Sequence, residues 1–277
     1  MNTPETLSAE ENLKLLTKWF ENFHSCIVAF SAGVDSSLLA AVSRKVLGDR
    51  SFAVTSISPA FSVSEREDAR KIAREIGVQL LEVSQNDLED ENYVKNGVMR
   101  CYFCRSNLAS AIEPLAKRLL VEVCVDGTHI DDLQTPRPGI KALREAGFRA
   151  PLAELHFGKN VVRQMARMVG LSNWERPSET CLSSRIAFGH KISLDTLNKI
   201  ELAESIVKSI TNARIVRVRT IGRNAMIEVD KKSVQIALEN KKLISKRLKE
   251  IGYDEVEVDL EGYVSGKMLE LFVKGGE

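Results

Sequence analysis

A short run of small and hydroxyl-bearing residues follows an apolar stretch near the N-terminus, and its residue types suit it to binding phosphate. Residues 27–30 are apolar enough for a buried parallel strand, and the small residues 31–33 allow a tight turn. The helix expected to begin near Ser36 points its first N–H groups back at that turn, where they attract an anion. The alternative is an ordinary strand-to-helix turn. The residues expected to line the phosphate cradle are Ser31, Ala32, Gly33, Val34, Asp35, Ser36 and Ser37.

This loop is neither a Walker loop nor a dinucleotide G-x-G-x-x-G turn. Residues 31–36 instead resemble the S-G-G-x-D-S signature of the PP-loop ATP pyrophosphatases, which include NAD, GMP and asparagine synthetases and tRNA thiolation enzymes. The resemblance implies that ATP is cleaved between its α and β phosphates, that the loop holds pyrophosphate and that Asp35 helps to hold Mg²⁺. Ala32 replaces the second glycine of the signature, and we expect it to have a negative φ.

The five cysteines fall into two groups. Cys101 and Cys104 form a C-x-x-C at the start of an expected helix that runs through residue 119, which suits half of a zinc site, a redox pair or part of an iron–sulfur site. Cys181 lies on a Pro- and Ser-containing loop after a helix over about residues 159–169. Cys26 and Cys124 lie inside apolar strands and are expected to be packing thiols. The four histidines are scattered and do not complete a zinc site: His24, His129, His156 and His190.

Three segments, taken in order, resemble the LarE family of PP-loop sulfur transferases over nearly the whole chain. They are DDLQTPRPGIKALREAGFRAPL at residues 131–152, NWERPSETCLSSRI at residues 173–186 and VRVR at residues 216–219. The resemblance implies that the protein uses ATP to activate the carboxylates of pyridinium-3,5-biscarboxylic acid mononucleotide and converts them to thiocarboxylates. It also implies a homo-oligomer, a trimer or a hexamer, and sulfide or another sulfur donor as a partner.

The family uses two sulfur chemistries. In one, a single cysteine at the position of Cys181 attacks the acyl-adenylate and loses its own sulfur. In the other, that cysteine joins a C-x-x-C to hold a 4Fe–4S cluster through three thiolates, and the open iron carries the sulfur that is transferred. Cys101, Cys104 and Cys181 match the second chemistry, which we therefore expect. The alternative is that Cys181 works alone beside a structural pair.

Several arginines are candidates for charge stabilisation. A free thiol with a pKa of about 8.5 is only slightly ionised at neutral pH, so a lone Cys181 would need help from Arg185 or Arg176; the alternative for Arg185 is a solvated side chain. Arg217 and Arg219 alternate with valines and so share one strand face. With Lys267 these two arginines suit a phosphomonoester of the substrate, although a strand with one wet face gives the same alternation. These residues are Arg217, Arg219 and Lys267.

Alternating strand and helix patterns in the first part of the chain predict a doubly wound parallel α/β sheet, whose strand ends converge on a ligand at a topological switch point. The resemblance to the PP-loop superfamily puts Ser56 and Ser58 beside adenine, and Gly127 ends a further strand at the same edge. From about residue 193 the pattern changes to a smaller α+β domain, in which one helix is expected over residues 233–251. We expect a PP-loop domain over residues 1–185 and a substrate-binding and oligomerisation domain over residues 186–277.

Composition argues against some classes of function. The 277 residues include 39 basic and 38 acidic side chains, a net charge of +1, so no positive field favours nucleic acid. The chain lacks a signal-peptide pattern and a membrane-length apolar run, so we expect a soluble cytoplasmic protein. A tRNA thiolase would favour a basic surface, an amidotransferase-type synthetase leaves the cysteines unexplained, and a nucleotide sensor remains a further alternative.

Overall fold

The chain divides into two compact units. The structure, a computed structural model, describes residue 4 and residues 6–135, 137–177 and 180–264. The first unit comprises Met1–Asp87 with Cys101–Glu179, and the second comprises Leu88–Arg100 with Thr180–Glu277. The sequence indicated one boundary near residue 185, whereas the structure also assigns a segment from the first half of the chain to the second unit.

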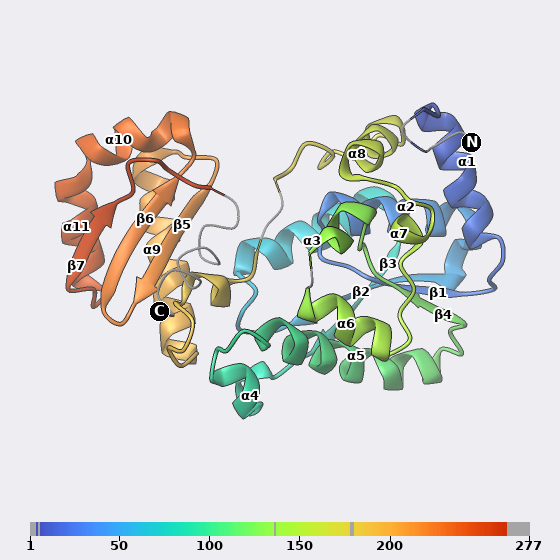
Figure 1. Ribbon diagram of the computed structural model, residues 1–277, viewed down its shortest axis with the longest axis horizontal. Helices are drawn as coiled ribbons and strands as arrows, with labels where there is room; N and C mark the ends of the chain where they lie inside the picture. Colours follow the sequence, from blue (N-terminus) through green and yellow to red (C-terminus); the bar gives the residue numbers. More distant parts are fainter. Residues whose placement is uncertain (1–3, 5, 136, 178–179, 265–277) are drawn as a thin grey trace. The chain divides into compact units, whose positions relative to one another are not determined.

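The first unit is built on a four-stranded parallel sheet, as expected for a doubly wound α/β domain (Figure 1). Its strands are β1 (Cys26–Ala29), β2 (Ser51–Ile57), β3 (Gln79–Ser84) and β4 (Val123–Val125), in the order β3-β2-β1-β4. The chain moves from β1 outward to β3 and then returns to the other side of β1. The switch point therefore lies between β1 and β4, where α/β sheets bind ligands beyond the carboxyl ends of the strands.

Helices cover both faces of this sheet (Figure 1). Alternate strand residues point to opposite faces, so Cys26 and Val28 join one apolar core while Ile27 joins the other. The first core is closed by α1 (Ala9–Phe20), α2 (Val34–Leu47), α3 (Val63–Ile76) and α8 (Lys159–Met168). The second core is closed by α5 (Arg100–Arg118) and α6 (Pro138–Glu145), and a short α7 (Pro151–Glu154) precedes α8.

The second unit has its own sheet and core. Its strands are β5 (Val216–Ile221), β6 (Asn224–Val229) and β7 (Glu255–Val258), with β5 and β6 antiparallel and β6 and β7 parallel. Its helices are α4 (Glu91–Val94), α9 (Leu194–Thr211), α10 (Val234–Glu239) and α11 (Lys241–Glu250). The single helix expected over residues 233–251 was wrong, because Asn240 separates α10 from α11 and its side-chain amide bonds the Ile236 carbonyl oxygen at 2.9 Å.

Buried hydrogen bonds attach the segment Leu88–Arg100 to the second unit. Asn96 is fully buried, and its side-chain amide donates to the carbonyl oxygens of Ala187 at 2.9 Å and His190 at 3.0 Å. The Ile192 amide donates to the Val94 carbonyl oxygen at 2.9 Å. This segment is therefore an integral part of the second unit, although it immediately precedes Cys101 in the chain.

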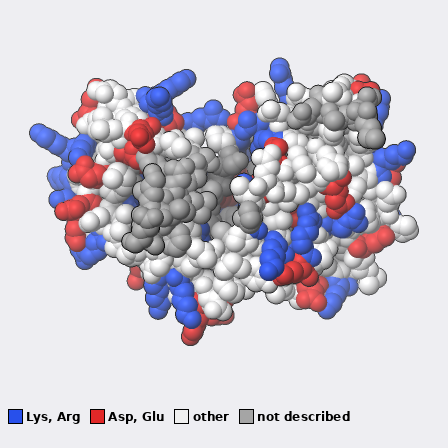
Figure 2. Space-filling view, in the orientation of Figure 1, with Lys and Arg blue, Asp and Glu red and all other residues white. Residues whose placement is uncertain are grey.

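The surface has no dominant sign of charge on the face drawn in Figure 2, where basic and acidic side chains are interspersed. This agrees with the net charge of +1. Among the described residues, no helix combines the length and the apolar character that crossing a membrane requires.

Candidate functional site

The loop between β1 and α2 has the geometry of an anion cradle. Gly33 is the N-cap of α2, and no side chain among the described residues caps the first turn, which leaves its amides for a ligand. Ser36 closes the loop, because its hydroxyl accepts from the Ser31 amide at 3.3 Å and donates to the Gly33 carbonyl oxygen at 3.1 Å. The Ser36 and Ser37 side chains are buried and Ser31 is exposed, so the open side of the loop faces solvent through Ser31.

The end of β4 lies directly against this loop at Gly127. A Cβ atom at position 127 would lie 3.0 Å from the Asp35 Cβ and 3.1 Å from the Ser36 backbone nitrogen. Because contacts this short are tighter than most Cβ contacts, a side chain at position 127 would need the first turn of α2 to give way by a few tenths of an ångström. The carboxyl ends of β1 and β4 therefore meet at the first turn of α2, at the topological switch point.

The expectation that Ala32 has a negative φ was wrong, since its φ is +55°. A residue with a Cβ pays about 1–2 kcal/mol in this left-handed region, where glycine is unstrained. The Ala32 carbonyl oxygen accepts a hydrogen bond from the side-chain amide of Asn173 at 2.8 Å. The loop thus keeps the backbone shape of a glycine-containing loop although alanine occupies the position, with support from a distant residue.

Asp35 is paired with a lysine that the sequence analysis did not single out. The Lys159 ammonium lies 2.8 Å from Asp35 Oδ1 and 2.6 Å from Asp35 Oδ2. Both side chains are about one-fifth exposed, at 21% for Lys159 and 22% for Asp35. Lys159 begins α8, and its backbone amide donates to Asp131 Oδ2 at 2.7 Å. A cation is therefore already present at the carboxylate beside the phosphate loop.

Ser56 and Ser58 lie at the carboxyl end of β2, and both are buried. The Ser58 hydroxyl donates to Asp87 Oδ2 at 2.9 Å, and Asp87 is only 1% exposed. Gln85 Nε2 donates to Asp87 Oδ1 at 2.7 Å and Asn107 Nδ2 to the same oxygen at 3.1 Å. Ser58 thus belongs to a buried polar network centred on Asp87, which the sequence analysis did not identify.

The C-x-x-C lies on the first turn of α5. Cys101 is exposed and Cys104 is half-buried. Gln85 Nε2 donates to the Cys104 carbonyl oxygen at 2.8 Å and lies 3.6 Å from the Cys104 sulfur, so the Asp87 network reaches this cysteine. Cys181 is half-buried and precedes the short helix η4 (Leu182–Arg185) of the second unit. Within either unit, no three His, Cys, Asp or Glu side chains among the described residues form a metal-binding group.

Cys26 and Cys124 are packing thiols in the first unit. Cys26 is fully buried in β1, and burial, followed by the neighbouring Cys124, raises its pKa well above the usual value. Burial raises the pKa of Cys124 in β4 to about 11. Both groups stay protonated near neutral pH, which makes them poor nucleophiles and poor ligands.

Arg185 is buried and ion-paired, so the solvated alternative was wrong. It is 3% exposed, and its Nε donates to Glu204 Oε1 at 2.8 Å. Its Nη1 donates to the Cys181 carbonyl oxygen at 2.9 Å and also to the Thr180 carbonyl oxygen. Arg185 therefore holds the backbone on which Cys181 sits. Arg176, the other candidate, belongs to the first unit and pairs with Asp68 at 2.6 Å.

Arg217 and Arg219 share one face of β5, as expected, but that face is not wet. They are 9% and 8% exposed. Arg219 donates to Glu228 Oε2 at 2.9 Å and to the Ser184 carbonyl oxygen at 3.0 Å, and the Arg217 guanidinium lies over the Tyr263 ring, 5.6 Å from its centre. Lys267, the third member of this group, lies outside the described residues.

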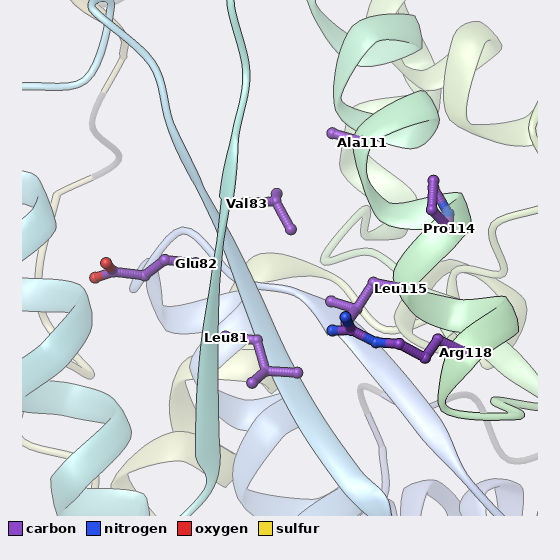
Figure 3. Close-up of a pocket in the computed structure, with 7 residues that line it drawn as sticks. All are labelled: Leu81, Glu82, Val83, Ala111, Pro114, Leu115 and Arg118. Carbon is purple, nitrogen blue, oxygen red and sulfur yellow. The ribbon is translucent and has the colours of Figure 1, made fainter.

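A cavity of about 400 Å³ lies elsewhere in the first unit, between the edge strand β3 and α5 (Figure 3). It is lined mainly by apolar side chains, and Glu82 points away from α5 to pair with Arg70 at 2.6 Å. None of the residues proposed for nucleotide, sulfur or substrate lines it. The lining residues are Leu81, Glu82, Val83, Ala111, Pro114, Leu115 and Arg118.

Full-length relatives define the family of this chain. It is 37% identical over 267 residues to the uncharacterized protein slr1717 of Synechocystis, covering 96% of this chain and 99% of that one. It is 31% identical over 248 residues to the pyridinium-3,5-bisthiocarboxylic acid mononucleotide synthase of Lactiplantibacillus plantarum, covering 89% and 90%. The uncharacterized protein MJ0830 of Methanocaldococcus jannaschii is 29% identical over 255 residues, covering 91% and 97%. No model of a protein family matches the chain.

The parallel sheet, with an anion-cradle geometry in the loop at its switch point, defines a doubly wound α/β protein. The similarity to the Lactiplantibacillus synthase extends over both units and identifies the family. The chain belongs to the LarE family and is an enzyme.

Proposed function

We propose that this protein is an ATP-dependent sulfur transferase that converts the carboxylates of pyridinium-3,5-biscarboxylic acid mononucleotide to thiocarboxylates. The observation that carries the proposal is the similarity, over 89% of the chain, to a synthase named for the bisthiocarboxylic acid product. The loop at the switch point of the first unit supplies the anion-binding geometry that ATP cleavage needs. Sulfur transfer to a carboxylate requires activation because a carboxylate is a poor electrophile.

In the first step a substrate carboxylate oxygen attacks the α-phosphorus of ATP, giving an acyl-adenylate and pyrophosphate. The amides of the α2 first turn, together with Ser31, Ser36 and Ser37, bind the departing pyrophosphate. The close approach of Gly127 supports this assignment, since position 127 places no side chain against the loop. Each well-placed donor that stabilises the developing charge is worth about 3–4 kcal/mol. Ser56 and Ser58 are assigned to the adenine side of the site.

Mg²⁺ fits the first unit at Asp35, whose carboxylate lies beside the phosphate loop and already faces a cation. The ion would neutralise phosphate charge there. Both Asp35 oxygens are engaged by Lys159, so a metal–nucleotide complex bound at Asp35 would compete with the lysine for this carboxylate. A phosphate oxygen is the natural new partner. Lys159 would then pair with the nucleotide when the site is filled.

In the second step a sulfur nucleophile attacks the adenylated carbonyl carbon and AMP leaves. We assign a 4Fe–4S cluster to Cys101, Cys104 and Cys181, in keeping with the family. The donor set fits, because all three side chains are thiols rather than disulfides and Cys101 and Cys104 are one helical turn apart. A cluster supplies deprotonated sulfur when bound. In this chain Gln85 orients Cys104, and Arg185 fixes the backbone of Cys181.

The second unit would bind the phosphomonoester of the substrate through Arg217, Arg219 and Lys267. Arg219 is already paired with Glu228, which orients its guanidinium within the β-sheet face. An external sulfide or sulfur donor and a trimeric or hexameric assembly complete the proposal. Nucleic acid is not expected as a partner, in line with the mixed charge of the surface.

Two measurements test the two steps separately. Nucleotide products made from ATP and the pyridinium biscarboxylate are separated by chromatography; AMP and pyrophosphate are expected, and ADP would contradict the assignment of the loop. Iron and acid-labile sulfide are then measured after anaerobic reconstitution of the wild type, Cys101→Ala and Cys181→Ala. About four irons per chain, lost in both variants, are expected for the cluster. No iron in the folded wild type would leave Cys181 as a sacrificial donor.

A further inference from the structure

Asn173 contacts the phosphate loop at two points from a distant part of the chain. Its side-chain amide donates to the Ala32 carbonyl oxygen at 2.8 Å and to the Ser37 hydroxyl at 2.9 Å. Asn173 is 6% exposed and lies beyond α8, and its partners lie on either side of the N-cap of α2. All three residues belong to the first unit. One side chain therefore links the turn that precedes the helix to the first turn of the helix itself.

Ala32 is the residue of this loop whose backbone needs support. Its φ of +55° lies in the region that glycine enters freely and alanine does not. Left without an external contact, an alanine here would favour a negative φ, and the peptide groups on either side of it would rotate. Those peptide groups belong to the cradle, so the rotation would misalign the amides that face an anion.

We propose that Asn173 is a positioning residue that holds Ala32 in its left-handed conformation and so keeps the phosphate loop in its anion-binding shape. The amide group suits this task because one nitrogen carries two N–H donors, enough for both acceptors. The proposal rests on the proposed function in one respect, namely that the loop binds pyrophosphate. It goes beyond that function because it explains how the loop keeps its shape with alanine at the second glycine position of the signature.

The effects of substitutions at positions 32 and 173 should depend on each other. If Asn173 acts by holding Ala32, its importance must fall when position 32 is glycine, because glycine adopts a positive φ without help. Contacting residues of this kind show non-additive effects in double-mutant cycles. If Asn173 merely packed in the core, replacing it would lower the affinity for pyrophosphate equally with alanine and with glycine at position 32.

The experiment measures binding of magnesium pyrophosphate by calorimetry in the wild type, Asn173→Ala, Ala32→Gly and the double variant. We expect Asn173→Ala to raise the dissociation constant about tenfold and the double variant to raise it less than about threefold relative to Ala32→Gly. Asn22→Ala is the control, because Asn22 is exposed and bonds only its own helix carbonyl groups among the contacts found in the described residues. It should bind pyrophosphate like the wild type.

Urea denaturation of the same four proteins separates the positioning role of Asn173 from the proposed pyrophosphate binding. If the wild type does not bind pyrophosphate, the proposed function fails, whereas a urea midpoint lowered by Asn173→Ala and restored by Ala32→Gly still supports the positioning role. If Asn173→Ala lowers the affinity and the urea midpoint equally with alanine and with glycine at position 32, the positioning role is overturned. Should Asn173→Ala not fold, Asn173→Ser, which is too short to reach both acceptors, replaces it with the same interpretation.

Discussion

Replacing Gly127 by alanine tests whether the end of β4 leaves room for a ligand at the phosphate loop. The backbone at position 127 is not in the left-handed region, so alanine is conformationally allowed there and the effect is steric. The added methyl group would lie 3.0 Å from the Asp35 Cβ and 3.1 Å from the Ser36 backbone nitrogen. Overpacking of this kind typically costs about 1–3 kcal/mol, which corresponds to a fall in melting temperature of about 2–4 °C per kcal/mol.

The same methyl group displaces the first turn of α2, whose amides form the cradle. Misaligning one hydrogen bond to a charged ligand costs about 1.5–3 kcal/mol, so the dissociation constant for magnesium pyrophosphate should rise at least about tenfold. The assay combines thermal unfolding with calorimetric titration of pyrophosphate. Gly97→Ala serves as the control, because a Cβ at position 97 has no neighbour within 4 Å among the described residues. Unchanged pyrophosphate affinity in Gly127→Ala would refute the placement of the anion at this loop.

Three further predictions concern the buried ion pair of the second unit, the reactivity of the cysteines and the role of Asp35. Arg219→Ala should lower the free energy of unfolding by about 3–5 kcal/mol, because it leaves the buried Glu228 carboxylate without its partner. Arg223→Ala breaks an exposed ion pair and should lower it by no more than about 1 kcal/mol. Equal losses of unfolding free energy in urea denaturation would contradict this. Iodoacetamide labelling followed by mass spectrometry should show that the exposed Cys101 reacts at pH 8 and that Cys124 hardly reacts. Burial raises the pKa of Cys124 to about 11, so its labelling rate should rise about tenfold for each pH unit up to that value. Fast labelling of Cys124 at pH 8 would count against its burial. Asp35→Asn should reduce AMP formation by about 10²-fold or more with an unchanged circular dichroism spectrum, and near-normal AMP formation would exclude Asp35 as the Mg²⁺ ligand.

Local patterns predicted the first unit well because its elements are fixed by short-range signals. An apolar run followed by small residues predicted β1 and the loop after it, and Gly77, with a φ of +72°, ends α3 as a left-handed cap. The alternation of strands and helices gave the parallel sheet. Each of these features depends on residues close together in the chain.

Long-range contacts were missed for the converse reason. Nothing in the sequence around Lys159 indicates that its ammonium reaches Asp35, 124 residues away. The same holds for Asn173, which bonds Ala32 across 141 residues. A single clue was available for Asn173, because the sequence departs from the loop signature at Ala32 and a compensating contact had to exist if the loop kept its shape.

Burial of charge was also hard to foresee from sequence. Arg217 and Arg219 alternate with valines in the way that a half-exposed strand does, so the pattern alone did not separate a wet face from a covered one. The structure buries both, with Glu228 as the partner of Arg219. Glu228 lies opposite Arg217 on the neighbouring antiparallel strand and bonds the diagonal Arg219, so the partner could be named only once the register was known.

The most direct test of the central claim is mass spectrometry of the pyridinium product formed by the anaerobically purified, reconstituted wild type with ATP, Mg²⁺ and sulfide. The account predicts thiocarboxylate product accompanied by AMP, formed over repeated turnovers and lost in Cys181→Ala. AMP without any thiocarboxylate, or thiocarboxylate formed without ATP, would contradict the proposal that this chain couples adenylation to sulfur transfer.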